Sequence, residues 1–372
     1  MIKKETEIPQ PHPSPEEWER LFDATVAFKD AKPWEWMYEQ QIFGVEEPET
    51  GRIGFCSVTG TLGEHVALIV YEGLEGLGRY LQFVVNHERG GGYLQQRETT
   101  FSLWEVPQLQ ASFEDRDLLD KIDYQIIRDA GLRFRGHNAW PRFRYYQPGR
   151  VPWYLNAPQV RFLTLMLEQT LVVAEEAQGP GLLALSLGEL ASVLPATPET
   201  VTLPVRVQEE GTWGVELREL EPRYAWYTFE GDLTPFERAR QRLTQQERVV
   251  QFHVTLIPGM SVSEDEIPPY LTYHMLLVDA EVGFIYGSDM LLARPSLSAM
   301  LADVPQRLLS LMEKIDFRPE EVQVASERLY NLLAVPLKQM GVTLNLYYEL
   351  PALEDALHEL ENWMEGRFPE DL

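Results

Sequence analysis

VQVASERLYNLLAVPLKQMGVTLNLYYEL, residues 322–350, is the stretch that decides the fold class. Alternating apolar residues at 322–325 predict a strand, and the apolar spacing of 326–340 predicts a helix that ends at Gly341. A second strand is expected at 343–350, followed by an amphipathic helix over 351–364. A strand, a helix and a strand at this spacing imply a parallel pair joined by a right-handed crossover.

The region before this unit is predicted to be mixed in the same way. Residues 201–207 and 212–220 form a hairpin pattern, and Thr234 begins a helix with a capping box. Further strands are expected at 248–257, 270–279 and 283–286, and a helix is expected at 297–314.

The first half of the chain repeats this order of elements. A strand is expected at 100–106, a helix at 114–130 with Gly131 as its stop, a strand at 132–135 and a helix at 158–177. The fold class is therefore α/β (α+β), with two similarly built αβ domains, each a mixed sheet with flanking helices. The domains are placed at 1–178 and 199–372, and an internal duplication is a hypothesis that their similar order raises.

The net charge limits the classes of partner. The 372 residues contain 58 acidic and 32 basic side chains, for a formal charge of -26. A molecule this acidic repels a phosphate backbone at long range. The charge therefore argues against general nucleic-acid binding and against binding to anionic membranes.

The compartment follows from cysteine use and hydropathy. The single cysteine, Cys56, fits a reducing cytoplasm and is expected to be a buried, inert side chain. The first fifteen residues have no apolar run, so no signal peptide is expected. The most apolar stretch, 160–174, is too short to span a membrane and is predicted to be a buried helix.

The segment GLRFRGHNAWPRFRYYQPGR, residues 131–150, is the one concentration of positive charge. It holds five arginines, one histidine and no acid. If each Arg-Phe-Arg triplet is extended, its two guanidinium groups share one face and its Phe takes the other.

Two interpretations of this segment stay open. The arginines and rings could bind a phosphate, a carboxylate or a nucleotide through guanidinium contacts and stacking. Alternatively, the arginines could pair with the chain's own surplus of carboxylates. The candidate ligand-binding residues are Arg133, Arg135, His137, Trp140, Arg142, Arg144 and Tyr146.

Several short runs resemble a known group of sequences. NAWPRFR at 138–144, YQPG at 146–149, PWYL at 152–155, PWEWM at 33–37 and SFEDR at 112–116 are similar to a signature of uncharacterised bacterial proteins known only as domains of unknown function. The terminal strand–helix–strand is similar to a small domain found at the end of such proteins. The resemblance implies membership of that group and no activity.

Other chemical motifs are weak or absent. His253 and His274 lie on expected strands and could meet Asp279 as a metal site, but nothing in their spacing requires one, and ordinary strand histidines are the favoured interpretation. No phosphate-binding loop, dinucleotide fingerprint, nucleophile elbow or zinc-protease motif is present, so no cofactor and no metal are expected.

Two functions of different class remain. The favoured one is a non-enzymatic cytoplasmic binding or regulatory module whose arginine and aromatic face takes an anionic small molecule or an acidic protein. The alternative is a hydrolase or transferase acting on a phosphorylated or carboxylated small molecule. In that enzyme His137 would donate a proton, and Glu64 or Asp115 would be the base.

Overall fold

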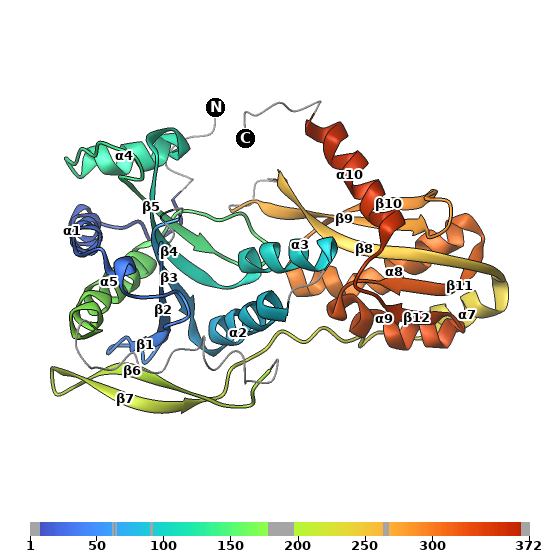
Figure 1. Ribbon diagram of the computed structural model, residues 1–372, viewed down its shortest axis with the longest axis horizontal. Coiled ribbons are helices and arrows are strands. Elements are labelled where there is room, and N and C mark those ends of the chain that lie inside the picture. The colour runs from blue at the N-terminus through green and yellow to red at the C-terminus, as the bar shows by residue number, and fades with distance from the viewer. Residues whose placement is uncertain are drawn as a thin grey trace. The chain divides into compact units, whose positions relative to one another are not determined.

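The computed structural model describes residues 8–61, 63, 65–89, 92–177, 197–262 and 268–365, and the chain divides into two compact units. The first unit comprises Met1–Glu88, Trp104–Gln147 and Pro152–Ala225. The second comprises Arg89–Leu103, Pro148–Val151 and Trp226–Leu372. Each unit has its own mixed sheet with flanking helices, so the two-part α/β architecture predicted from the sequence is confirmed (Figure 1).

The first unit is built on a seven-stranded sheet in the order β5-β4-β3-β2-β1-β6-β7. β1 and β6 run parallel, and the other neighbours run antiparallel. The strands are β1 (Phe43–Glu46), β2 (Ile53–Thr59), β3 (Ala67–Glu72), β4 (Gln108–Glu114), β5 (Trp140–Tyr146), β6 (Val201–Glu209) and β7 (Thr212–Leu220).

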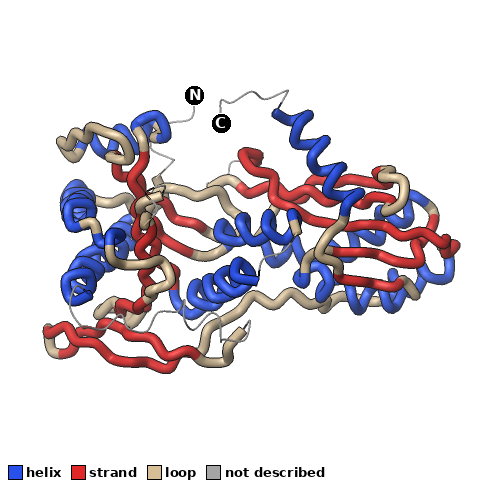
Figure 2. The backbone as a smooth tube through the Cα atoms, in the orientation of Figure 1, coloured by secondary structure: helices blue, strands red, loops and turns tan. Residues whose placement is uncertain are grey.

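Helices cover both faces of this sheet. α1 (Pro15–Ala31) and α5 (Ala157–Ala177) lie on one face, where they share a core with Cys56, Leu68 and Phe143. α2 (Gly73–Arg89) lies on the other and packs on Phe55, Tyr71 and Val205 (Figures 1 and 2). Both faces are apolar because each strand contributes alternate residues to each core.

The start of α1 and the burial of α5 follow from their sequences. Ser14 caps α1 with a complete capping box to Glu17. α5 carries the most apolar stretch of the chain and is buried along most of its length. Within the described residues, no helix has the length and apolarity that crossing a membrane requires.

The second unit has a five-stranded sheet in the order β10-β9-β8-β11-β12. α3 and α10 pack with Leu276 and Val278 of β9 on one face of the sheet. The elements are α3 (Tyr93–Ser102), α7 (Thr234–Arg242), β8 (Thr244–Val262), β9 (Tyr270–Asp279), β10 (Ile285–Leu292), α8 (Leu297–Ile315), β11 (Phe317–Val324), α9 (Glu327–Met340), β12 (Thr343–Leu346) and α10 (Pro351–Glu365).

The terminal strand–helix–strand is present as predicted. β11 and β12 pair in parallel, with α9 between them in the chain. Gly341 ends α9 in the left-handed region at φ 70°, where a residue with a Cβ is disfavoured. β12 is shorter than predicted, because residues after Leu346 leave the sheet before α10 begins.

The prediction for residues 100–135 is wrong in two places. The expected strand at 100–106 is the end of α3 and a 3-10 turn, and the strand lies instead at β4, where Leu109, Ala111 and Phe113 alternate into the core. The expected strand at 132–135 is a loop. α4 (Lys121–Asp129) is correspondingly shorter than the predicted helix, because Asp120 caps it.

These differences remove the parallel pair expected in the first half. β4 and β5 are antiparallel neighbours, with Ala111 opposite Phe143. The first unit's only parallel pair among the described strands is β1 with β6. The two sheets therefore differ in strand order, and the structural basis for the duplication hypothesis is gone.

The position of the 201–220 hairpin also corrects the domain boundary. The sequence places this hairpin at the head of a second domain beginning at 199. In the structure Val205 of β6 pairs with Gly44 of β1, so the hairpin extends the first sheet. The first unit therefore continues to Ala225. The expected break at 178–181 lies outside the described residues.

Candidate functional site

The two Arg-Phe-Arg triplets lie in different local structures. Arg133–Arg135 falls in the loop after α4, whereas Arg142–Arg144 lies on the edge strand β5. In β5 the predicted alternation holds, since Phe143 packs 5.3 Å from the ring of Phe22 while its two arginine neighbours face the other side of the sheet. Only the second triplet is anchored as a strand.

Arg144 is committed to carboxylates of its own unit. Its two Nη atoms donate to Asp123 at 2.8 and 2.7 Å, and Nη2 also donates to Asp120 at 2.8 Å. The guanidinium lies 4.6 Å from the ring centroid of Tyr154. This side chain therefore fastens the start of α4 to β5, and it has the intramolecular role that the second sequence interpretation describes.

The same two carboxylates form the N-terminal cap of α4. Asp120 accepts from the backbone amides of Ile122 and Asp123, and Asp123 accepts from the amide of Asp120. Burial opposes the charge of Asp120, but the Tyr154 hydroxyl, Arg144 and the two amides outweigh burial and hold the pKa of Asp120 below its ordinary value. The two carboxylates that cap α4 therefore also accept the hydrogen bonds of the Arg144 guanidinium.

His137 lies at the tip of the loop and is held by Asp115. Its Nδ1 is 2.8 Å from Asp115 Oδ2, and the Asn138 backbone amide donates to Oδ1 of the same carboxylate at 2.8 Å. The hydrogen bond from the Asn138 amide, with a smaller effect from His137, holds the pKa of Asp115 below its ordinary value. The His137 side chain is 79% exposed. Asp115 therefore anchors this loop.

Arg142 and Tyr146 share the β5 face of Arg144 and are half-buried. Arg142 Nε is buried without a hydrogen-bond partner among the described residues. Burial raises the pKa of the Tyr146 hydroxyl, and the neighbouring arginines oppose that rise. Neither residue lines the cavity described next.

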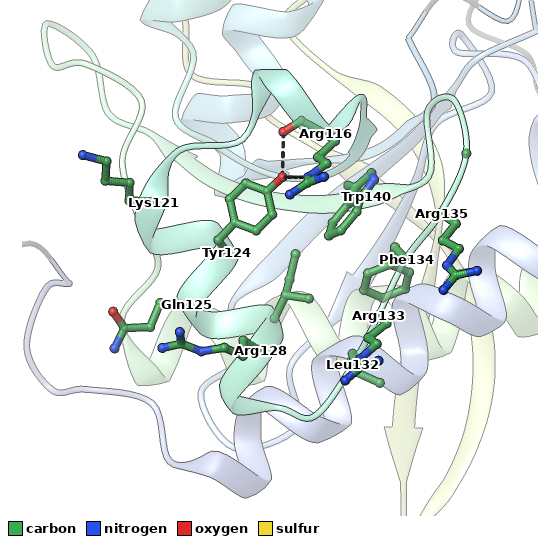
Figure 3. A pocket seen from close by; sticks show the side chains of 12 residues that line it. Arg116, Lys121, Tyr124, Gln125, Arg128, Leu132, Arg133, Phe134, Arg135 and Trp140 are labelled. Atoms are coloured by element: carbon green, nitrogen blue, oxygen red, sulfur yellow. Dashed lines mark hydrogen bonds between the residues drawn. The ribbon is translucent and has the colours of Figure 1, made fainter.

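A hollow of about 700 Å³ opens between α4 and the loop that follows it (Figure 3). We call it the basic hollow, because five of its lining residues are cationic and none is acidic. The residues that line it are Arg116, Lys121, Tyr124, Gln125, Ile127, Arg128, Leu132, Arg133, Phe134, Arg135, Gly136 and Trp140.

The five cations come from three pieces of backbone. Arg116 is in a 3-10 turn, Lys121 and Arg128 are on α4, and Arg133 and Arg135 are in the loop. Within the described part of the chain, no carboxylate forms an ion pair with Lys121, Arg133 or Arg135.

The other two cations are engaged only in part. Arg128 pairs with Asp129 at 3.6 Å, but both side chains are largely exposed, and such pairs contribute little. Arg116 Nε donates to the Tyr124 hydroxyl, which leaves its Nη atoms for other contacts. All five charges thus remain accessible to an anion.

Three rings lie among these cations. The ring centroid of Trp140 is 5.5 Å from that of Tyr124 and 6.0 Å from that of Phe134, with interplanar angles of 59° and 66°. Figure 3 shows the three rings in the middle of the hollow with basic side chains around them. The hollow therefore combines an aromatic centre with a cationic rim, a pattern typical of small-molecule sites.

Three of the seven candidate residues line the hollow, namely Arg133, Arg135 and Trp140. His137, Arg142, Arg144 and Tyr146 do not. The contribution of α4 to the hollow was not predicted from the sequence. Its signal was the spacing of Lys121, Gln125 and Arg128, which places one polar stripe along the exposed side of a helix.

The other sequence candidates lie elsewhere. His253 and His274 share one face of the β8–β9 pair, with Thr255 opposite His274, whereas Asp279 is bound by Arg248 and Tyr286 at 2.9 and 2.8 Å. In the described ranges no cluster of three His, Cys, Asp or Glu is placed to hold a metal. Glu64 lies outside the described residues. Burial raises the pKa of the Cys56 thiol to about 12, which makes it a poor nucleophile.

Two family matches cover most of the chain. Residues 18–186 match the family described as Domain of unknown function (DUF7309), and residues 236–361 match Domain of unknown function (DUF6930). No curated protein matches the sequence. The resemblance to domains of unknown function is therefore confirmed, and the basic hollow lies within the first matched region.

Proposed function

We propose that this chain, which carries two domains of unknown function, is a non-enzymatic binding or regulatory module that takes a small anionic ligand in the basic hollow. The observation that carries the proposal is the composition of the hollow's lining, which has five cations and no carboxylate in a chain of net charge -26. Opposite charge concentrated locally gives an anion one favourable place on a repelling surface.

The state of the individual arginines supports the same assignment. Arg144 is saturated by Asp120 and Asp123, so it serves the fold. Arg133 and Arg135 are exposed in the loop and have no ion pair with any described carboxylate. Guanidinium groups that a protein does not use internally are suited to phosphate and carboxylate groups, because their planar N–H donors match those oxygens.

A binding assay tests the proposal directly. Titration calorimetry at low salt with pyrophosphate as the probe is expected to show saturable binding, and Arg133→Ala with Arg135→Ala is expected to abolish it. The control variant, Arg20→Ala with Arg161→Ala, also removes two positive charges, but from α1 and α5, where these arginines pair with Glu168 and Glu17. That control should bind as the wild type does. Equal loss in both variants would reject the hollow as the site.

A second candidate function rests on the pair of His137 and Asp115. A histidine oriented by a carboxylate at 2.8 Å is the arrangement of a general acid or base, and its neighbour Gly136 lines the hollow. In this proposal the chain is a hydrolase or transferase acting on a phosphorylated or carboxylated small molecule. It predicts turnover that His137→Gln abolishes while ligand affinity is kept.

We also place the protein in the cytoplasm. The single cysteine is unpaired and fully buried, a use of cysteine that needs no oxidising compartment.

A further inference from the structure

We infer that the ligand of the basic hollow joins a planar ring to its anionic group, as a mononucleotide does. This inference rests on the proposed function and narrows it to phosphorylated heterocycles. Three features of the hollow carry it: the rings at its centre, the apolar surface around them and the absence of a compact phosphate cradle.

The first feature is the arrangement of the rings. Tyr124 and Phe134 are tilted by 59° and 66° from the plane of Trp140, and both are partly exposed, as Trp140 is. Aromatic pairs are stable in such tilted and edge-on arrangements, so a further ring that enters beside them can make the same contacts. An anion without a ring would leave this surface unused.

The second feature is what surrounds the rings. Ile127 and Leu132 add apolar surface to the lining, and Gln125 adds a side-chain amide with both a donor and an acceptor. A heterocycle offers apolar faces and a polar edge, so it can use both kinds of group. The cations lie around this centre, which fits a ligand whose charge is separated from its ring (Figure 3).

The third feature is that no tight cradle for a bare phosphate is present in this part of the structure. The N-terminus of α4 is adjacent, but its amides at Ile122 and Asp123 already donate to Asp120. The five cations are on exposed side chains from three separate segments. Long exposed side chains lose rotamer freedom when they bind, so phosphate alone is held weakly and the ring supplies the remaining affinity.

A polymeric ligand fits the chain less well. A strand of nucleic acid extends beyond the hollow over a surface that carries the negative charge of the rest of the molecule. A single nucleotide places its phosphate against the local cations and leaves nothing outside the hollow.

The experiment compares three probes on the full chain by titration calorimetry: adenosine 5′-monophosphate, ribose 5-phosphate and inorganic phosphate. The nucleotide is expected to bind about tenfold more tightly than ribose 5-phosphate, within the range that stacking of one base contributes. Trp140→Leu should remove this difference and leave the affinity for ribose 5-phosphate within about twofold. Phe134→Leu, in the exposed loop, is a second variant for the case that Trp140→Leu fails to fold.

The outcomes separate the two levels of the proposal. Equal affinity for the nucleotide and ribose 5-phosphate would overturn the ring inference and keep the anion site. An acidic peptide is titrated as a fourth probe. If it binds and the three small probes do not, both the ring inference and the small-ligand function are overturned in favour of a protein partner. No binding of any anion would overturn the proposed function itself, and the ring inference with it.

Discussion

Arg144 and Asp123 form a doubly hydrogen-bonded ion pair, at 2.8 and 2.7 Å, in which each side chain is only 5% exposed. Asp123 lies in the first turn of α4, and Arg144 lies on β5, so the pair connects the wall of the basic hollow to the sheet. The pair holds α4 in place and so maintains the shape of the hollow. Because Arg144 is occupied in this way, it is not available to a ligand.

Arg144→Ala is therefore expected to destabilise the first unit strongly. Removing one partner of a buried pair leaves the other charge uncompensated, which costs about 3–5 kcal/mol. Urea unfolding followed by tryptophan fluorescence measures the effect. Arg133→Ala, an exposed residue without an ion pair to a described carboxylate, should change the unfolding free energy by less than about 0.5 kcal/mol. Similar unfolding free energies for the two variants would show that the ion pair of Arg144 and Asp123 does not stabilise the first unit.

Binding in the hollow is expected to depend on salt. The five cations are exposed, so added ions screen them. Pyrophosphate affinity should fall about tenfold or more between roughly 50 and 500 mM NaCl, since the screening length drops from about 14 to about 4 Å. Calorimetry across this range, with the single variant Arg133→Ala as the comparison, should give a shallower slope in the variant, which keeps four of the five lining cations. A salt-independent affinity would contradict an electrostatic site.

The fold was predictable where local signals agree with one another. Residues 322–350 carry a change of period, a cap at Ser326 and a glycine stop at Gly341, and all three are present in the structure. At 108–114 the signals conflict. Polar residues alternate with Leu109, Ala111 and Phe113, and Glu114 with the acids after it indicates a helix start. The helix actually begins seven residues later, at Lys121, because burial of the β4 face outweighs local propensity.

The site was predictable only in its charge. The sequence shows that residues 131–150 are cationic, but the separation of Arg144 from Arg133 depends on which carboxylates reach them. Asp120 and Asp123 reach Arg144 because the antiparallel pairing of β4 and β5 places that arginine under α4. This pairing is long-range information that no local pattern contains. The predicted domain boundary was wrong for the same reason, since the pairing partner of β6 is β1, about 160 residues earlier in the chain.

Close packing of α5 on β2 makes Gly54 sensitive to substitution. A Cβ at this position would lie 2.6 Å from Met166 Sδ, 2.7 Å from Val70 Cγ1 and 3.0 Å from Phe162 Cζ. Gly54→Ala is expected to lower the unfolding free energy by about 1–3 kcal/mol through overpacking.

Gly214 on β7 offers a matched control, because nothing lies within 4 Å of the Cβ that alanine would add. Gly214→Ala should be neutral or stabilise by up to about 1 kcal/mol, as it restricts the unfolded chain. Thermal unfolding of the two variants measures the contrast, and a stable Gly54→Ala protein would mean that the α5–β2 contact is looser than described.

The last prediction concerns pH and His253, which is 2% exposed in the second unit. Burial, with smaller effects from Arg328 and Arg97, lowers the pKa of His253 to about 3 from the ordinary 6.5. Between these values His253 takes up a proton in the unfolded chain but not in the folded chain. Its contribution to the free energy of unfolding is therefore fully present above pH 6.5 and is lost as pH falls toward 3. The loss from this residue is at most about 1.4 kcal/mol per pH unit. Urea unfolding at several pH values should therefore show a shallower decline in His253→Leu than in the wild type. Identical slopes would mean that His253 is protonated in the folded protein.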